Sequence, residues 1–175
     1  MRTATTTRPR ARARRGAWAA RTACVVGLLY ACVSAYWGAG GTRLLDTVGG
    51  SLARLGHAHD TPLIVAIWGT VALNVAAGLL PLPALRNPAE RPRRITRLLA
   101  WIAAAILTVY GAVLTTVGLL VQADVIRSPA SADRRALMWH AYPWDPWFLL
   151  WGLLIATALL RSKTMTQPIL VHARV

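Results

Sequence analysis

The amino-acid sequence predicts an all-α integral membrane protein, a bundle of four transmembrane helices whose two termini face the cytoplasm. Hydrophobic residues make up 55% of the 175 residues, and they gather into long runs, a pattern typical of membrane proteins. Residues 25–33, 63–80, 98–121 and 147–160 contain no charged side chain. The 20 basic and six acidic residues therefore lie in the termini, in the connections and at the edges of the spans.

Four segments are long enough to cross a bilayer. The hydrocarbon layer is about 30 Å thick and a helix rises about 1.5 Å per residue, so a span needs about 20 mostly apolar residues. The predicted spans are residues 18–38, 62–80, 98–122 and 144–161, which form one transmembrane domain over residues 18–161. A basic, disordered cytoplasmic tail is predicted for residues 1–17, and a second cytoplasmic tail for residues 162–175. The first span is interpreted as a retained anchor, because aromatic residues close it instead of a small-residue cleavage site.

Basic residues orient the predicted spans. Seven arginines lie before or in the first turn of the first span, the last of them Arg21, and five lie in the second loop. Three basic residues, beginning with Arg161, lie at or after the end of the last span, whereas the first and third loops carry two and three arginines. Because basic residues are enriched in cytoplasmic connections, both termini and the second loop are predicted to be cytoplasmic in the plasma membrane. The expected partners of these arginines are anionic lipid headgroups. A net charge of +14 would also attract nucleic acid, but its distribution over alternate connections argues against a nucleic-acid partner.

The first loop contains a short amphipathic segment. Leu44, Leu45, Val48, Leu52 and Leu55 have nearly the spacing of one helix face. A short helix lying on the outer membrane surface is therefore expected.

The fourth span begins in a tryptophan-rich stretch, MWHAYPWDPWFLLWG, at residues 138–152. Asp145 followed by Pro146 predicts a helix start, with Asp145 as the N-cap and Pro146 at the first helical position. Tryptophans with helical spacing are expected on one face at the depth of the membrane interface, where indoles are enriched. The predicted helix cap and interface motif comprises Trp139, His140, Trp144, Asp145, Pro146, Trp147 and Trp151.

A second interpretation gives part of this motif a chemical role. The predicted topology places His57, His59, His140 and Asp145 on the same outer side of the membrane. Imidazole and carboxylate groups bind Zn²⁺ and Cu²⁺, so these four residues are candidate metal ligands. Their spacing matches no fixed metal-binding pattern, and no catalytic residue and no cofactor are expected.

Polar side chains within the spans are few, and Asn74 and Tyr110 are the main candidates for a role there. Such groups can mark a transport pathway. They can also join helices, and Asn74 is expected to form a hydrogen bond with a hydroxyl group on a neighbouring helix. Because the apolar runs carry no ionised residue, the joining of helices is favoured over ion-coupled transport. Small residues that would allow close approach are Gly69, Ala72, Ala76, Gly111 and Gly118.

Three parts of the chain resemble a known family. They are residues 36–42 (YWGAGGT), residues 107–111 (LTVYG), and Trp139-His140 together with residues 144–148 (WDPWF). From about residue 25 to residue 160 the chain is similar to an uncharacterised actinobacterial family of small four-helix integral membrane proteins, a domain of unknown function. The resemblance implies a plasma-membrane location and four spans, and it implies no activity.

Two classes of function remain open from the sequence. We expect a small multi-pass membrane protein without catalytic activity that acts through helix–helix association, either as a homo-oligomer or with another membrane protein. The alternative is a membrane enzyme, or a metal- or quinone-handling protein, that uses the His and Asp residues of the outer face. A subunit of a small-solute transporter is a second alternative.

Overall fold

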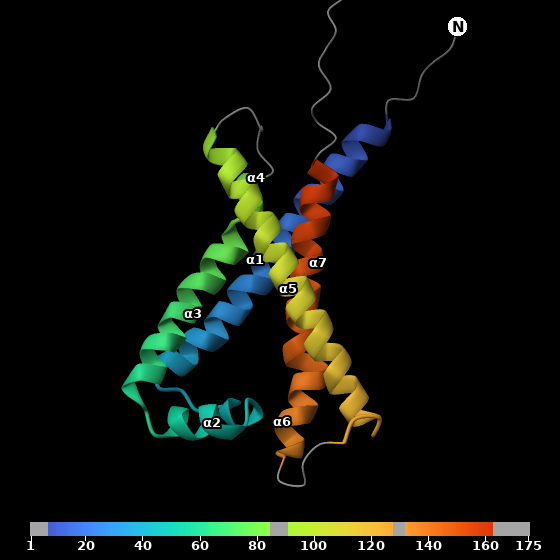
Figure 1. Ribbon diagram of the computed structural model, residues 1–175. Coiled ribbons are helices and arrows are strands. Elements are labelled where there is room, and N and C mark those ends of the chain that lie inside the picture. Colours follow the sequence, from blue (N-terminus) through green and yellow to red (C-terminus); the bar gives the residue numbers. More distant parts are fainter. Residues whose placement is uncertain (1–6, 85–90, 128–131, 163–175) are drawn as a thin grey trace, which may run out of the picture.

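The structure is a computed structural model that describes residues 7–84, 91–127 and 132–162. Every regular element in these residues is helical (Figure 1). The elements are α1 (Thr7–Gly38), the 3-10 turn η1 (Leu45–Thr47), α2 (Gly50–His57), α3 (Thr61–Leu79), α4 (Pro81–Ala84), α5 (Arg91–Gln122), α6 (Arg134–Trp139), the π-helical turn η2 (His140–Trp144) and α7 (Asp145–Ser162). The predicted all-α class is confirmed.

Four helical stretches are long and apolar enough to cross a membrane, as the sequence predicts. They are Gly16–Gly38, Thr61–Pro83, Arg94–Gln122 and Arg134–Ser162. The first helix starts earlier than expected, because α1 begins at Thr7 and residues 7–17 are helical instead of disordered. Alanine and arginine, which are common in this segment, are good helix formers and continue the helix beyond the span.

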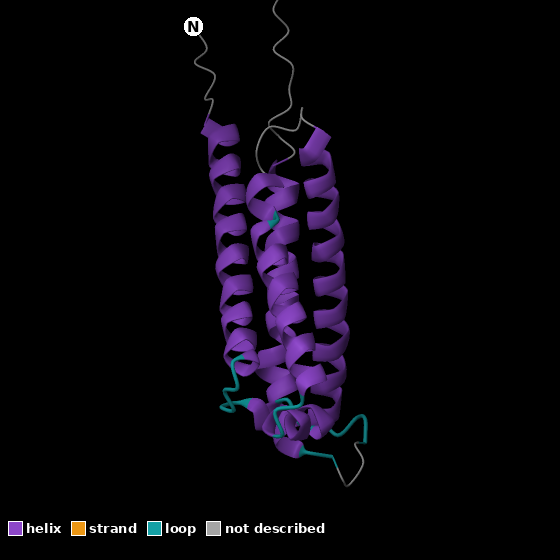
Figure 2. Cartoon of the chain, turned by 90° about the vertical axis from the view of Figure 1, so that its left-hand side faces the viewer, coloured by secondary structure: helices purple, strands orange, loops and turns teal. Residues whose placement is uncertain are grey.

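Successive spans run in opposite directions (Figures 1 and 2). The start of α1, the end of α7, α4 and the start of α5 lie at one end of the molecule, which we call the terminal end. The elements α2 and α6 lie at the opposite end, which we call the loop end. The short amphipathic helix expected in the first loop is present as α2, with Ala53 buried and Leu52 and Leu55 exposed.

The four spans pack in the order α3, α1, α7, α5. Within the described residues, α3 packs mainly on α1, α1 also packs on α7, and α5 packs mainly on α7. The α1/α3 pair and the α5/α7 pair diverge toward the loop end in Figure 1. The main core lies between α1, α5 and α7 and consists of Ala23, Val26, Ala100, Ala104, Trp151, Ile155 and Leu159. The two outer helices, α3 and α5, therefore expose most of their surface.

Glycines allow the spans to approach each other closely. A Cβ atom added at Gly27 would lie 2.4 Å from the ring of Trp151 and 3.0 Å from the Cα atom of Gly78, so α1 meets both α7 and α3 at this residue. A Cβ atom added at Gly111 would lie 2.3 Å from the backbone nitrogen of Leu149, so α5 and α7 almost touch there. In lipid there is no hydrophobic driving force for helices to associate, because the lipid tails are as apolar as the side chains. Close packing through small residues stabilises the bundle instead.

The prediction that Asp145 caps the fourth span is wrong. The helical path starts at Arg134, and its N-cap is Asp133, whose carboxylate accepts hydrogen bonds from the backbone N–H groups of Arg135 and Ala136. The backbone N–H of Asp145 already donates to the carbonyl of His140, five residues earlier. A proline inside a helix cannot donate and crowds the preceding turn, and the wider π turn that contains Pro143 lets the helix continue.

Candidate functional site

The candidate site lies at the loop end, where the first loop contacts the π turn η2. Thr47 is fully buried, and its hydroxyl accepts a hydrogen bond from Nε1 of Trp144 at 3.1 Å. The same hydroxyl donates to the carbonyl of Leu44, which fixes its orientation. One residue further on, the carbonyl of Val48 lies 3.3 Å from Nε2 of His140. These contacts attach the first loop to the start of the fourth span.

His140 and Asp145 form a pair at the centre of this contact. Nδ1 of His140 lies 3.3 Å from Oδ1 of Asp145, whose side chain is only 6% exposed. Because the Val48 carbonyl can only accept, a hydrogen bond to it requires a proton on Nε2. The hydrogen bond to Asp145 then requires a second proton, either on Nδ1 or on the carboxyl group. When His140 forms both hydrogen bonds, the pair carries one proton more than a neutral imidazole and an ionised carboxylate carry together.

Aromatic rings extend from this pair along the helices, away from the loop end. Trp144 packs edge-on against Trp37 and Tyr30, with ring centroids 5.7 Å and 6.0 Å apart. Phe148, one turn further along α7, lies 4.7 Å from Tyr30 and 5.4 Å from Tyr110. We call this set the aromatic ladder. It joins α1, α5 and α7, and each offset or edge-on pair adds about 0.5–1.5 kcal/mol beyond the burial of area.

Most tryptophans of the predicted interface motif have structural partners. Nε1 of Trp147 donates to the carbonyl of Val26 at 3.2 Å, which joins α7 to α1. Trp139 lies 6.1 Å from Trp144, again between ring centroids. Trp151 is fully buried in the core, so its predicted place at the interface is wrong. The close approach of α1 at Gly27 covers its ring, and the sequence spacing alone could not show this.

The structure does not bring the four candidate metal ligands together. His57 pairs with Asp46 at 2.7 Å on the surface, apart from the His140 and Asp145 pair. His59 has a positive φ of 50° in the turn before α3. Within the described residues, no group of three or more His, Cys, Asp and Glu side chains could hold a metal ion.

The two polar residues singled out within the spans differ in their surroundings. Asn74 is 7% exposed, and its Nδ2 atom has no hydrogen-bond partner among the described residues, so the expected bond from this atom to a hydroxyl group is not observed. Tyr110 is 48% exposed and belongs to the aromatic ladder. Sequence reasoning missed Thr47, because its partner Trp144 lies 97 residues away and neither residue carries a motif that connects them.

Comparison with protein families adds one finding. Residues 27–155 match a family described as "Protein of unknown function (DUF3995)". The chain belongs to this family. The matched region of this family member includes the pair His140 and Asp145 and the whole aromatic ladder, and it agrees with the resemblance inferred from the sequence to a domain of unknown function. No curated protein and no solved structure matches the chain.

Proposed function

We propose that the chain is a non-catalytic component of the plasma membrane that acts by associating with other membrane helices, including those of a second copy, through the outward face of α3. One observation supports this proposal most strongly. Gly69 has no atom within 4 Å of the position where a Cβ would lie, in contrast to Gly27, Gly78 and Gly111, which each meet a neighbouring helix. Gly69 would thus allow another helix to approach α3 closely, but no described helix of the same chain packs against it.

The residues around Gly69 extend this free face along the helix. Gly69, Ala72 and Ala76 fall on one side of α3, and all three are exposed. The opposite side packs on α1, where Gly78 and Asn74 are buried. Small residues at this spacing allow two membrane helices to approach closely, and packing is the main source of attraction between helices in lipid. The outward face therefore has the composition of a helix–helix contact.

The association predicted for α3 is tested with a larger side chain. We expect Gly69→Leu to weaken association at least about 10-fold, equivalent to ~1.4 kcal/mol, because the new side chain would keep the two backbones apart. Energy transfer between labelled copies in vesicles, measured over a range of protein-to-lipid ratios, gives the association constant. The fold should be unaffected, since the structure leaves open space at this residue.

Two comparisons make this test specific. Ala72→Leu should weaken association as Gly69→Leu does, whereas Thr70→Leu should have little effect, because Thr70 is also exposed but lies about 100° around the helix from Gly69 and about 160° from Ala72. Equal weakening by all three substitutions, or a monomeric wild-type chain at every ratio, would contradict the proposal.

The proposed orientation places the terminal end in the cytoplasm. The segments on that side of the spans carry 15 of the 20 basic residues, whereas the first and third connections carry five, together with five of the six acidic residues. Basic segments remain in the cytoplasm and contact anionic headgroups there. The arginine-rich and alanine-rich composition further supports an actinobacterial plasma membrane.

Reporter fusions test this orientation. A reporter that works only outside the cytoplasm should be active when fused near Gly56 and inactive after Arg94 or at Val175. A second reporter that works only in the cytoplasm should give the opposite pattern and controls for expression. Activity of the first reporter after Arg94 would show that the orientation is reversed.

A further inference from the structure

Two neighbouring contacts hold the first loop on the π turn η2, and one of them depends on a proton. Nε1 of Trp144 donates to the buried hydroxyl of Thr47, and both of these groups are neutral. The second contact joins Nε2 of His140 to the carbonyl of Val48, while Nδ1 of the same ring contacts Asp145. The imidazole makes both of its hydrogen bonds only when the pair His140 and Asp145 carries the additional proton. Docking of the first loop is thereby linked to proton binding.

Loss of this proton leaves one donor on the imidazole ring for two acceptors. The side chain of Asp145 is 6% exposed, and a buried carboxylate without a partner costs more than the unpaired carbonyl of the half-buried Val48. The remaining proton therefore stays on Nδ1, between the ring and the carboxylate. Nε2 then presents a lone pair to the carbonyl of Val48, and two acceptors that face each other repel. The contact that fails is the one to the first loop.

We propose that the pair His140 and Asp145 is a proton-dependent latch for the first loop. The loop is docked when the proton is bound, and it opens more readily when the proton leaves to water through the imidazole, which is 39% exposed. Because the docked state holds one proton more than the open state, acid favours docking and alkali favours opening. Trp144 belongs to the aromatic ladder, so opening also removes a partner from this end of the ladder.

The latch does not depend on the association proposed for α3, because it lies at the loop end and involves other helices. In the proposed orientation it responds to the pH outside the cytoplasm. Its response to pH in a purified sample is the same in either orientation, so the two proposals can fail separately.

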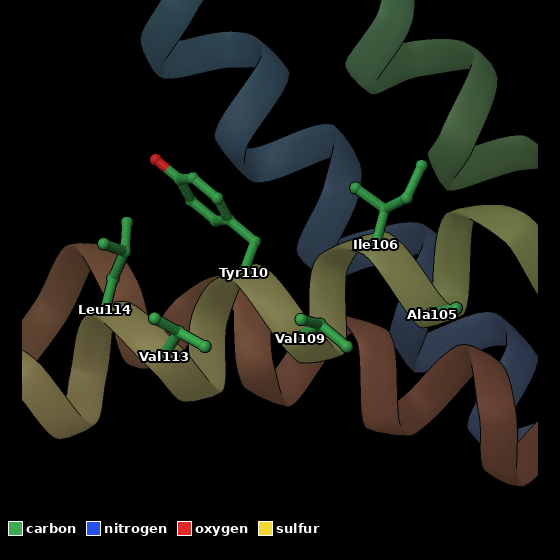
Figure 3. A pocket seen from close by; sticks show the side chains of 6 residues that line it. All are labelled: Ala105, Ile106, Val109, Tyr110, Val113 and Leu114. Carbon is green, nitrogen blue, oxygen red and sulfur yellow. The ribbon is translucent and has the colours of Figure 1, made fainter.

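Other titratable groups surround the pair. Tyr30 and Tyr110 interact electrostatically with the Asp145 carboxylate, and Tyr110 also borders an apolar pocket on α5, with its hydroxyl pointing away from this helix (Figure 3). At the loop end, η1, η2 and the elements that contact them also carry Tyr142, Asp46, Arg54, His57, Asp133, Arg134 and Arg135. Phenol, carboxyl and guanidinium groups ordinarily titrate outside the range of about pH 5.5–8.5, whereas imidazole titrates within it. His57, which pairs with Asp46 of η1, is therefore the residue to control.

Hydrogen exchange of the full chain in lipid nanodiscs, measured over the range of about pH 5.5–8.5, tests the proposal. Protection factors compare each amide with an unstructured peptide at the same pH, so they remove the intrinsic effect of pH on exchange. The protection of η1 should fall as the pH rises, by up to about 10-fold per pH unit, the limit for one proton. The protection of α5 and α7 around Ala104 and Ile155 should stay constant and reports that the core is intact.

Asp145→Asn gives the sharpest comparison. The amide of asparagine can donate to Nδ1 of a neutral imidazole, which leaves the ring proton on Nε2 for the carbonyl of Val48. Both contacts then form without an additional proton, so η1 should stay as protected at the alkaline end of the range as it is in the wild type at the acidic end. His140→Gln has no titratable group and should protect η1 more weakly and independently of pH.

His57→Asn is the matched control, because it removes the other imidazole beside η1 and leaves the latch in place. Its pH dependence should equal that of the wild type. Three results would overturn the proposal: protection of η1 in the wild type that does not change with pH, a pH dependence that persists in Asp145→Asn, or one that disappears in His57→Asn.

Discussion

Replacing Gly111 by alanine is expected to lower the free energy of unfolding by about 1–3 kcal/mol, the usual cost of overpacking a close contact. The added Cβ atom would lie 2.3 Å from the backbone nitrogen of Leu149 and 2.7 Å from its Cα atom. A flexible side chain could move away, but these are backbone atoms of α7, so the two helices must separate. The neighbouring close approach at Gly152, whose added Cβ would lie 2.6 Å from the backbone nitrogen of Thr108, would loosen as well. Thermal unfolding in detergent measures the loss.

Gly69→Ala is the matched control for this prediction. The substitution is the same and also lies within a span, but no atom lies within 4 Å of the new Cβ. Its expected effect is neutral, or slightly stabilising by up to about 1 kcal/mol, because alanine loses less backbone entropy than glycine in a helix. If Gly111→Ala were as stable as Gly69→Ala, the close approach of α5 and α7 would be refuted.

Replacing His140 by alanine is expected to cost about 1–3 kcal/mol, because it leaves the buried Asp145 carboxylate without its hydrogen-bond partner. The substitution also removes the contact with the carbonyl of Val48, which attaches the first loop to the fourth span. The loop end should therefore open more readily than the rest of the chain. Hydrogen exchange of the backbone amides in η1 and α6, together with thermal unfolding, measures both effects.

Substitutions of Asp145 distinguish pairing with His140 from helix capping. Asp145→Asn keeps a side chain that can bond His140 and should be mild, whereas Asp145→Ser and Asp145→Ala should be similarly destabilising because neither reaches the imidazole. Serine would rescue a true N-cap. In the double variant with His140→Ala, the two losses should overlap by about 0.5–3 kcal/mol, as expected for residues in contact. Strictly additive losses would show that the two side chains do not interact.

The positions of the spans could be predicted from the sequence, because the composition of each segment is enough to indicate a membrane-spanning helix. The runs 63–80 and 98–121 hold only uncharged and mostly apolar residues, and the structure forms a long helix over each of them. Hydrogen bonding within a single segment and the thickness of the membrane set the length of a span, and both are local properties. The same locality explains why a short helix could be expected in the first loop, although α2 contains only Leu52 and Leu55 of the five apolar residues that predicted it.

Asp145 shows where local reasoning failed. Asp-Pro is a common helix start, and this dipeptide alone cannot reveal that Asp133 has already started the helix or that a π turn carries it past Pro143. The partner of Asp145 is His140, and that contact depends on the π turn, which shifts side chains around the helix axis. The structure does place His140 and Asp145 side by side, but Asp145 does not have the N-cap role that the sequence predicted.

The sequence by itself determined the number of spans and their approximate limits, because hydrophobicity acts residue by residue along the chain. Only the tertiary structure decided that the spans pack in the order α3, α1, α7, α5. That order depends on which glycines face each other, such as Gly27 and Gly78, and no local pattern encodes such a pairing. The same packing buries Thr47 beneath Trp144 and leaves Tyr110 half exposed, because a helix face becomes part of the core only when its neighbours are in place.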